Sequence, residues 1–245
     1  MFDLLIGLSS FIAGAIASVT GFGIGSILTP LLSLQVGTRI AVAAVSIPHV
    51  VATFVRFWIL RREINKRVLL DFGLLSAAGG LVGALLHSVA SSPVLAYIFA
   101  FLLMFAGLTG ITGHARKMQF GPKVARVAGA VSGALGGLVG NQGGIRSAAL
   151  VGFDLDQRSF VATATAVGLI VDSVRMPVYF ATEATEIFSI GGMIVVSTIG
   201  VLAGTFFGLS VLRGIRQQFF YRMVGALVFA LGVFMLIQAA HNTGS

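Results

Sequence analysis

The residues best suited to chemistry form a polar stripe that occurs twice in the chain. In the first copy, four polar side chains recur at spacings of three, four and three residues: Ser46, His49, Thr53 and Arg56. In the second copy, the same spacing gives Thr165, Gly168, Asp172 and Arg175. Such spacing places the members of a stripe on one face of a helix. A charged side chain inside a membrane helix costs about 2.5–3.5 kcal/mol on insertion scales, so each stripe is a candidate for function.

The titratable members of these stripes also have a structural interpretation. Arg56 precedes Arg61 by five residues, so its long side chain could reach the membrane surface. Asp172 and Arg175 lie three residues apart and could form an ion pair that only stabilises the helix. His49 follows Pro48 and could be a hydrogen-bonded packing residue. The sequence leaves both interpretations open.

Two glycine clusters predict breaks in apolar helices. They read Gly21-Phe22-Gly23-Ile24-Gly25 and Gly140-Asn141-Gln142-Gly143-Gly144, and glycine weakens a helix by about 1 kcal/mol per residue. After each break, the unpaired N–H groups and the positive dipole end of the next half-helix form an anion site. The predicted ligand residues at the breaks are Gly23, Gly25, Asn141, Gln142, Gly143, Gly144 and the following Arg146.

The charges of these segments do not balance. Three arginines, Arg56, Arg146 and Arg175, accompany one acid, Asp172, and we expect no other acid in the core, so two positive charges remain. An anionic ligand is the natural partner for this surplus. The guanidinium group suits oxyanions because it donates paired hydrogen bonds.

Composition places these segments in a lipid bilayer. Of 245 residues, 57% are hydrophobic and 10% are charged, whereas a soluble domain carries about 25% charged residues. The net charge of +8 is concentrated in short loops, which indicates membrane topology and not nucleic-acid binding. The chain has no cysteine and its four histidines lack metal-ligand spacing, so we expect neither a metal nor a cofactor. The N-terminus lacks the basic region of a signal peptide, and we take it as the first membrane segment.

Eight apolar stretches predict an all-α polytopic membrane protein. They cover residues 2–35, 40–60, 68–87, 94–113, 126–153, 160–181, 188–212 and 219–240, and most have the length of about 20 residues that spans a bilayer. A shift of 119 positions superposes the halves and pairs glycines and arginines: Gly14 with Gly133, Gly21 with Gly140, Arg39 with Arg158 and Arg56 with Arg175. Farther on, a shift of 121 pairs Gly79 with Gly200 and Gly83 with Gly204. We predict two membrane repeats, residues 1–120 and 121–245, within one integral membrane domain.

Loop charges predict that the two repeats are inverted. If each broken segment is a re-entrant hairpin followed by three crossings, 12 Lys and Arg residues share one face, in the loops at 61–67, 114–126 and 213–222 and at Arg158. The other face keeps Arg39 with three acids: Asp3, Glu183 and Glu186. Positive loops face the cytoplasm, so we predict that both termini lie outside. Inverted repeats with broken helices are typical of secondary transporters.

The glycine motifs resemble those of a known family. Gly21-Phe22-Gly23-Ile24-Gly25 with Pro30 is similar to the first-half motif of the TauE/SafE family of sulfite exporters. Residues 140–147, which read GNQGGIRS, resemble the second-half motif in one branch of that family. The likeness covers essentially the whole chain. It implies a bacterial inner-membrane protein that moves sulfite, organosulfonates or related sulfur compounds.

We therefore predict a secondary carrier, an exporter, for a small sulfur-containing anion. The anion would lie near the midplane between the glycine-broken helices, where Arg56 and Arg175 would meet it from opposite faces. Alternating access would expose this site to one side of the membrane at a time. Asp172 would hold an arginine in place or carry a coupling proton, and a sodium ion is the other candidate for coupling. A passive anion channel could use the same site. We expect no enzyme activity and no nucleic-acid partner, and the sequence leaves the oligomeric state open.

Overall fold

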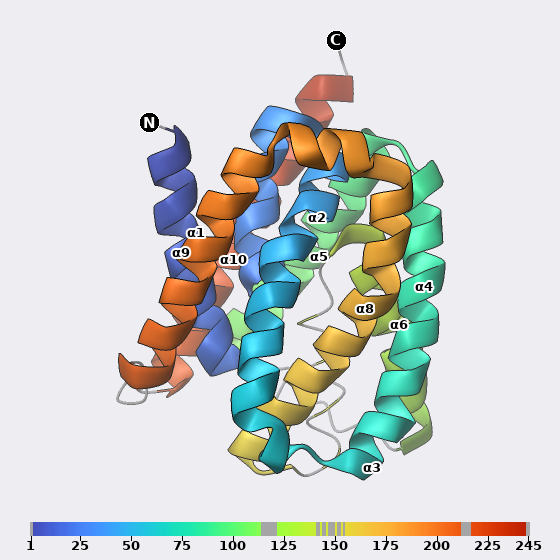
Figure 1. Ribbon diagram of the computed structural model, residues 1–245, viewed down its shortest axis with the longest axis vertical. Coiled ribbons are helices and arrows are strands. Elements are labelled where there is room, and N and C mark those ends of the chain that lie inside the picture. The colour runs from blue at the N-terminus through green and yellow to red at the C-terminus, as the bar shows by residue number, and fades with distance from the viewer. Residues whose placement is uncertain are drawn as a thin grey trace.

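The chain is a bundle of long apolar helices (Figure 1). The computed structural model describes residues 2–113, 122–140, 155–211 and 217–243, and the single residues Gly143, Arg146, Leu150 and Phe153. No strand occurs in these ranges. The helices are α1 (Phe2–Thr20), α2 (Ile24–Leu60), α3 (Lys66–Val68), α4 (Leu74–Val89), α5 (Ser92–Thr112), α6 (Pro122–Val139), α8 (Gln157–Ser189), α9 (Gly191–Val211) and α10 (Gln217–Thr243).

Six helical segments in the described ranges are long and apolar enough to cross a membrane. They are Phe2–Thr20, Ile24–Glu63, Lys66–Val89, Ser92–Thr112, Arg158–Ser189 and Gly191–Ser210. Two shorter apolar segments, Arg126–Val139 and Gly225–His241, accompany them. The predicted all-α polytopic membrane protein is confirmed.

The structure interrupts helical geometry near two predicted boundaries. The sequence predicts a boundary between residues 35 and 40, and α2 consists of two helical segments joined at Gly37, whose φ of 75° and ψ of 162° are not helical and suit a residue without a side chain. The sixth apolar stretch is predicted to end at residue 181, and α8 is interrupted at Glu183, whose φ is −137°. Residues 184–189 after this interruption are nevertheless helical, although the apolar pattern stops before them.

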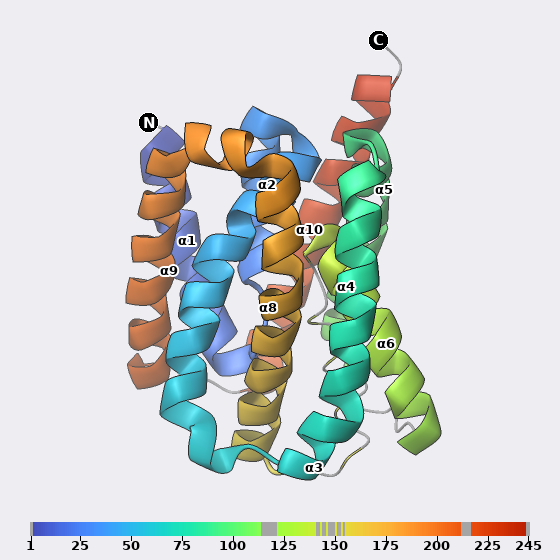
Figure 2. The same ribbon diagram turned by 45° about the vertical axis from the view of Figure 1, so that its right-hand side comes forward.

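The first glycine cluster closes a helical hairpin. In Figures 1 and 2, α1 runs away from the N-terminal end, and the first part of α2 returns toward that end before the helix bends. Gly21 and Gly23 make the break, with φ of 80° and 125°. Gly140, which follows α6, has a similar φ of 72°. It is the residue that the offset of 119 pairs with Gly21.

The helices pack in pairs that an exchange of the two predicted halves would preserve. The pairs are α1 with α9, α4 with α6, α2 with α8 and α5 with α10. Exchange maps α1 and α9 onto α6 and α4, and it returns the other two pairs unchanged. This pairing supports the inverted repeat, which remains our proposal together with its two halves.

Glycines allow close backbone approach in the two exchanged pairs. A Cβ atom at Gly14 of α1 would collide with the carbonyl oxygen of Val201 in α9. At Gly133 of α6, the matching position, it would collide with the carbonyl oxygen of Ser76. Gly79 of α4 lies in the same way against the carbonyl of Ala130 in α6. Small residues at helix contacts are typical of membrane proteins.

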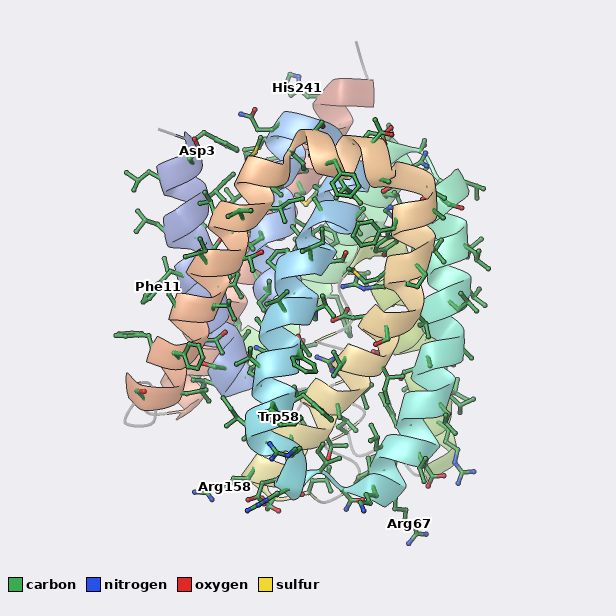
Figure 3. All side chains as sticks on the ribbon, viewed as in Figure 1. Asp3, Phe11, Trp58, Arg67, Arg158 and His241 are labelled. Carbon is green, nitrogen blue, oxygen red and sulfur yellow. The ribbon has the colours of Figure 1, made fainter. Side chains whose placement is uncertain are left out.

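The bundle has two chemically different ends. Figure 3 shows Asp3 and His241 at the end where both termini lie, which we call the terminal end. Arg67 and Arg158 lie at the opposite end, beside α3, which we call the basic end. The predicted separation of the loop at 61–67 and of Arg158 from the termini agrees with this arrangement, whereas residues 114–121 and 212–216 of the other two basic loops lie outside the described residues. The orientation of the bundle in its membrane remains a prediction.

Candidate functional site

The two polar stripes meet in the middle of the bundle, because α2 packs against α8. His49 Nδ1 of α2 lies 2.7 Å from Asp172 Oδ2 of α8. Along α2, Arg56 Nη2 donates to Thr53 Oγ1 at 3.1 Å, and Thr53 Oγ1 lies 3.5 Å from His49 Nδ1. All four side chains are buried. His49 thus forms a hydrogen bond with Asp172 that joins the two stripes.

Asp172 and Arg175 form the ion pair that their spacing predicted. Arg175 Nε donates to Asp172 Oδ1 at 2.9 Å, and Arg175 Nη2 lies 2.7 Å from the same oxygen. Arg175 Nη1 donates to the carbonyl of Gly136 in α6 at 2.9 Å. Every nitrogen of the Arg175 guanidinium group therefore has a partner within the protein.

Arg175 belongs to a group of three side chains that cap the C-terminal end of α6. Tyr179 Oη donates to the carbonyl of Gly137, the next residue along α6. His87 Nδ1 lies 2.7 Å from the carbonyl oxygen of Leu138, the residue after that. The last carbonyls of a helix lack partners within it, so these donors stabilise the helix end at the second break. Neither Tyr179 nor His87 was a predicted site residue, although Tyr179 continues the second stripe at a spacing of four residues.

Arg146 connects the two glycine breaks. Its Nη2 donates to the carbonyl of Gly21 at 3.1 Å. Its Nη1 lies against α8 at Gly168, where an added Cβ atom would stand 2.8 Å from that nitrogen. Gly25 contacts the other break directly, because a Cβ atom there would lie 2.7 Å from the carbonyl oxygen of Gly140.

Two of the buried arginines retain unused hydrogen-bond donors. In Arg56 and in Arg146, Nε and Nη1 have no partner among the residues that the structure describes. The Thr165 Oγ1 hydroxyl, also buried, has none in the same ranges. Arg56 is 1% exposed, so its side chain does not extend to the surface.

A small cavity lies where the breaks meet Arg146 and His49. Its volume is about 10 Å³, and its walls are Phe22, Gly23, Gly25, Ser26, His49, Gly140, Gly143 and Arg146. This space holds about one water molecule. Four of the residues predicted from the glycine clusters therefore share one cavity with His49. A larger cavity of about 80 Å³ lies at the bend of α2, beside Ser33, Gly37 and Ser92, and contains none of the predicted site residues.

The remaining predicted residues lie in different surroundings. Ser46 Oγ donates to the carbonyl of Ala43 at 2.5 Å and contacts Met176 Sδ at 2.9 Å, so it is satisfied away from the arginines. Asn141, Gln142 and Gly144 lie outside the described residues.

The expectation that the core holds no further acid is wrong. Glu183 was assigned to the face of the termini, but it is 1% exposed. The reason is that α8 continues beyond the predicted end and carries Glu183 against Arg39, whose Nε donates to Glu183 Oε1 at 2.8 Å. Because Arg39 balances Glu183, the three arginines around Asp172 still carry a surplus of two positive charges.

Comparison with known proteins adds one finding to this geometry. A family model described as Sulfite exporter TauE/SafE matches residues 6–235. No curated protein and no solved structure matches the chain. The matched range includes both stripes, both breaks and all three buried arginines.

Proposed function

This chain belongs to the TauE/SafE family of sulfite exporters, and we propose that it is a secondary carrier in which Arg56 and Arg146 bind a small sulfur oxyanion or organosulfonate. The observation that carries the proposal is the pair of buried guanidinium groups with unused donors. A buried charge without hydrogen-bond partners is costly. An oxyanion between the two groups would accept from their Nε and Nη1 atoms, and the Thr165 hydroxyl could add a further donor.

The charge balance favours an anion over a neutral substrate. Asp172 lies in the same polar stripes, but it is already engaged by His49 and by Arg175. Its charge is therefore not available to neutralise Arg56 and Arg146. A sulfite dianion would match both arginines, and a sulfonate would match one of them.

We assign a different role to Arg175. Its nitrogens bind Asp172 and the end of α6, so in this arrangement it positions the second break. The direct contact with the anion that the sequence predicted for Arg175 would require these bonds to open. Arg56 and Arg146 need no such change.

The size of the cavity favours a carrier over a passive channel. A space of about 10 Å³ holds about one water molecule, so an anion must move the two breaks apart in order to bind. The breaks belong to different halves of the proposed repeat, and rocking of one half against the other is the usual form of alternating access. The anion would then be exchanged with one side at a time.

Binding to the purified protein tests the proposed ligand residues. Titration calorimetry with sulfite, thiosulfate, sulfate and methanesulfonate should show binding of at least one of these anions. Arg146→Gln should weaken it roughly tenfold to a hundredfold, because a hydrogen bond from a charged group contributes about 1.5–3 kcal/mol. Arg62→Gln, an exposed arginine at the basic end, is the matched control and should bind as the parent does. Equal affinity in Arg146→Gln and the parent would contradict the site.

Counterflow in proteoliposomes distinguishes a carrier from a channel. Unlabelled anion trapped inside the vesicles should accelerate entry of labelled anion, because a carrier returns faster when it is loaded. A passive channel gives no such acceleration.

A further inference from the structure

A second buried polar cluster lies apart from Arg56 and Arg146, between the bend of α8 and the end of α6. Glu183 Oε1 accepts from Arg39 Nε at 2.8 Å and lies 3.4 Å from His87 Nε2. The side chains of Glu183 and His87 are 2% and 0% exposed. Glu183 Oε2 and His87 Nε2 have no hydrogen-bond partner in the part of the chain that the structure describes. Two acceptors of one cluster are thus buried and unused.

The hydrogen bond at Nδ1 of His87 determines which ring nitrogen is unprotonated in the neutral ring. A carbonyl oxygen can only accept, so the contact of 2.7 Å between His87 Nδ1 and the Leu138 carbonyl requires a proton on Nδ1. In the neutral ring, Nε2 then carries a lone pair and faces the Glu183 carboxylate, which also only accepts. One added proton on Nε2 turns this opposition into a charge-assisted hydrogen bond.

We propose that His87 Nε2, facing Glu183, is the binding site of a proton that is coupled to anion movement. This inference rests on the proposed carrier function and gives it a coupling ion. In the sequence analysis the candidate for a coupling proton was Asp172. In the structure Asp172 already has two cationic or hydrogen-bonding partners, whereas His87 Nε2 has none in the described ranges.

The groups that face this pair come from each helix that packs around it. They are Arg39 of α2, His87 of α4, and Tyr179 and Glu183 of α8, and α6 contributes the Leu138 carbonyl. Arg39 is 32% exposed in its side chain, and its backbone N–H donates to Ser92 at the start of α5. Arg39 is thus the partly exposed member of this cluster, and we expect the proton to enter past it.

The pair is connected to the anion site through the capped end of α6. The His87 and Tyr179 rings lie 4.8 Å apart, and Arg175, Tyr179 and His87 hold three consecutive carbonyls. Proton binding draws His87 toward Glu183 and stabilises this arrangement of the second break. After the proton leaves, His87 Nε2 and the Glu183 carboxylate face each other as two acceptors. This favours separation of α4 from the bend of α8.

The fold itself does not require this pair. At the offset of 119, the first-half position that matches Tyr179 is Leu60. At the offset of 121, the second-half position that matches His87 is Gly208. If the proposed repeat holds, neither the histidine nor the tyrosine has a titratable counterpart in the other half. A chemical role specific to one half is the better explanation.

A pH gradient across proteoliposomes tests the proposal. Methanesulfonate is the probe, because its charge stays constant near neutral pH, whereas sulfite gains and loses a proton there. The parent should accumulate labelled methanesulfonate against its gradient when a pH difference is imposed. His87→Gln and Glu183→Gln should lose at least tenfold of this accumulation, and the accumulation measured relative to the counterflow of the same variant should fall by a similar factor. His241→Gln and Glu186→Gln, exposed residues at α10 and on α8, are matched controls and should behave as the parent does.

The outcomes separate the two proposals. A parent that shows counterflow with none of sulfite, thiosulfate, sulfate and methanesulfonate contradicts the carrier function itself. A parent with counterflow but without accumulation driven by pH, or variants that accumulate as well as the parent does, overturns the proton site alone.

A measurement on the parent removes dependence on the folding of the variants. With histidine labelled by nitrogen-15, the His87 signal should change between a ring protonated only at Nδ1 and a doubly protonated ring as pH falls. A His87 ring that keeps one form throughout the pH range of transport overturns the proposal.

Discussion

At the scale of single residues, the three buried arginines differ in how many of their donors are used. All guanidinium nitrogens of Arg175 contact Asp172 or a carbonyl of α6, whereas Arg56 and Arg146 each donate to one oxygen through Nη2. All three carry the same charge and are equally buried, since each residue is 1% or 2% exposed. The inventory of hydrogen bonds therefore predicts different consequences for their loss.

Removal of Arg175 should reduce stability more than anion affinity. Arg175→Ala leaves Asp172 buried beside His49 only, and the loss of one partner of a buried pair costs about 3–5 kcal/mol. Thermal unfolding in detergent should show a lower melting temperature, and the double variant with Asp172→Ala should recover part of it. If Arg175→Ala melts like the parent but loses anion binding, Arg175 is a direct ligand, as the sequence predicted.

A small side chain at Gly168 should displace Arg146. A Cβ atom at this position would lie 2.8 Å from Arg146 Nη1, which is closer than the contact distance of about 3.5–4.0 Å. Gly168→Ala should therefore weaken anion binding although it removes no charge. The control is Gly191→Ala, where an added Cβ atom meets no other atom within 4 Å. Unchanged affinity in Gly168→Ala would separate Arg146 from the anion.

At the scale of helices, the bundle depends on backbone contacts at glycines. Gly14 and Gly133 occupy matching positions in α1 and α6, and each lies against a carbonyl of the helix it packs on. Neither position can accept a methyl group unless the two helices separate.

Alanine at either position should therefore destabilise the bundle. Overpacking of this kind costs about 1–3 kcal/mol, so Gly14→Ala and Gly133→Ala should both lower the melting temperature. Gly192→Ala, with open space around it, should have no effect or a slightly stabilising one, because alanine favours helices. A melting temperature that is equal in all three variants would show that these helices pack differently.

The sequence was sufficient for features that depend on neighbours along one helix. The spacing of His49, Thr53 and Arg56 predicted a shared face, and the structure places them in one hydrogen-bonded row. The glycine clusters likewise predicted a break at Gly21 and Gly23. Both signals are local, so periodicity and propensity reveal them.

Features that depend on contact between helices could not be predicted. Glu183 follows the apolar stretch, so its pattern indicated a loop, but Arg39 and His87 from two other helices enclose it. The bond from Arg146 to Gly21 joins residues 125 positions apart. Such partners follow from packing geometry, which one sequence without homologues does not specify.

At the scale of the whole molecule, the two ends of the bundle carry different charge. The terminal end holds Asp3 and His241, and the basic end holds Arg67 and Arg158. Because basic loops remain in the cytoplasm, we expect the terminal end to lie outside the cell.

Labelling of single cysteines tests this orientation, since the chain has no cysteine of its own. Ser91→Cys and Glu186→Cys should react with a membrane-impermeant maleimide added to intact cells. Arg67→Cys and Arg158→Cys should react only after the membrane is opened. Reaction of Ser91→Cys and Arg67→Cys from the same side would contradict the arrangement.

The cap on α6 makes the two orientations of a carrier unequal. At the end of α1, Ile16 and Ala17 accept from Thr20 and Gly21 of their own hairpin, and Gly136 of α6 likewise accepts from Gly140. The α6 end has additional donors from other helices, Arg175 and Tyr179 of α8 and His87 of α4. A difference of even one hydrogen bond, about 1 kcal/mol, biases a two-state population about fivefold. The anion would then meet mostly the competent form on one side and mostly the incompetent form on the other, which raises the apparent Kd there in proportion. Such a carrier binds the anion more readily from one face of the membrane than from the other when the anion concentration is equal on both sides.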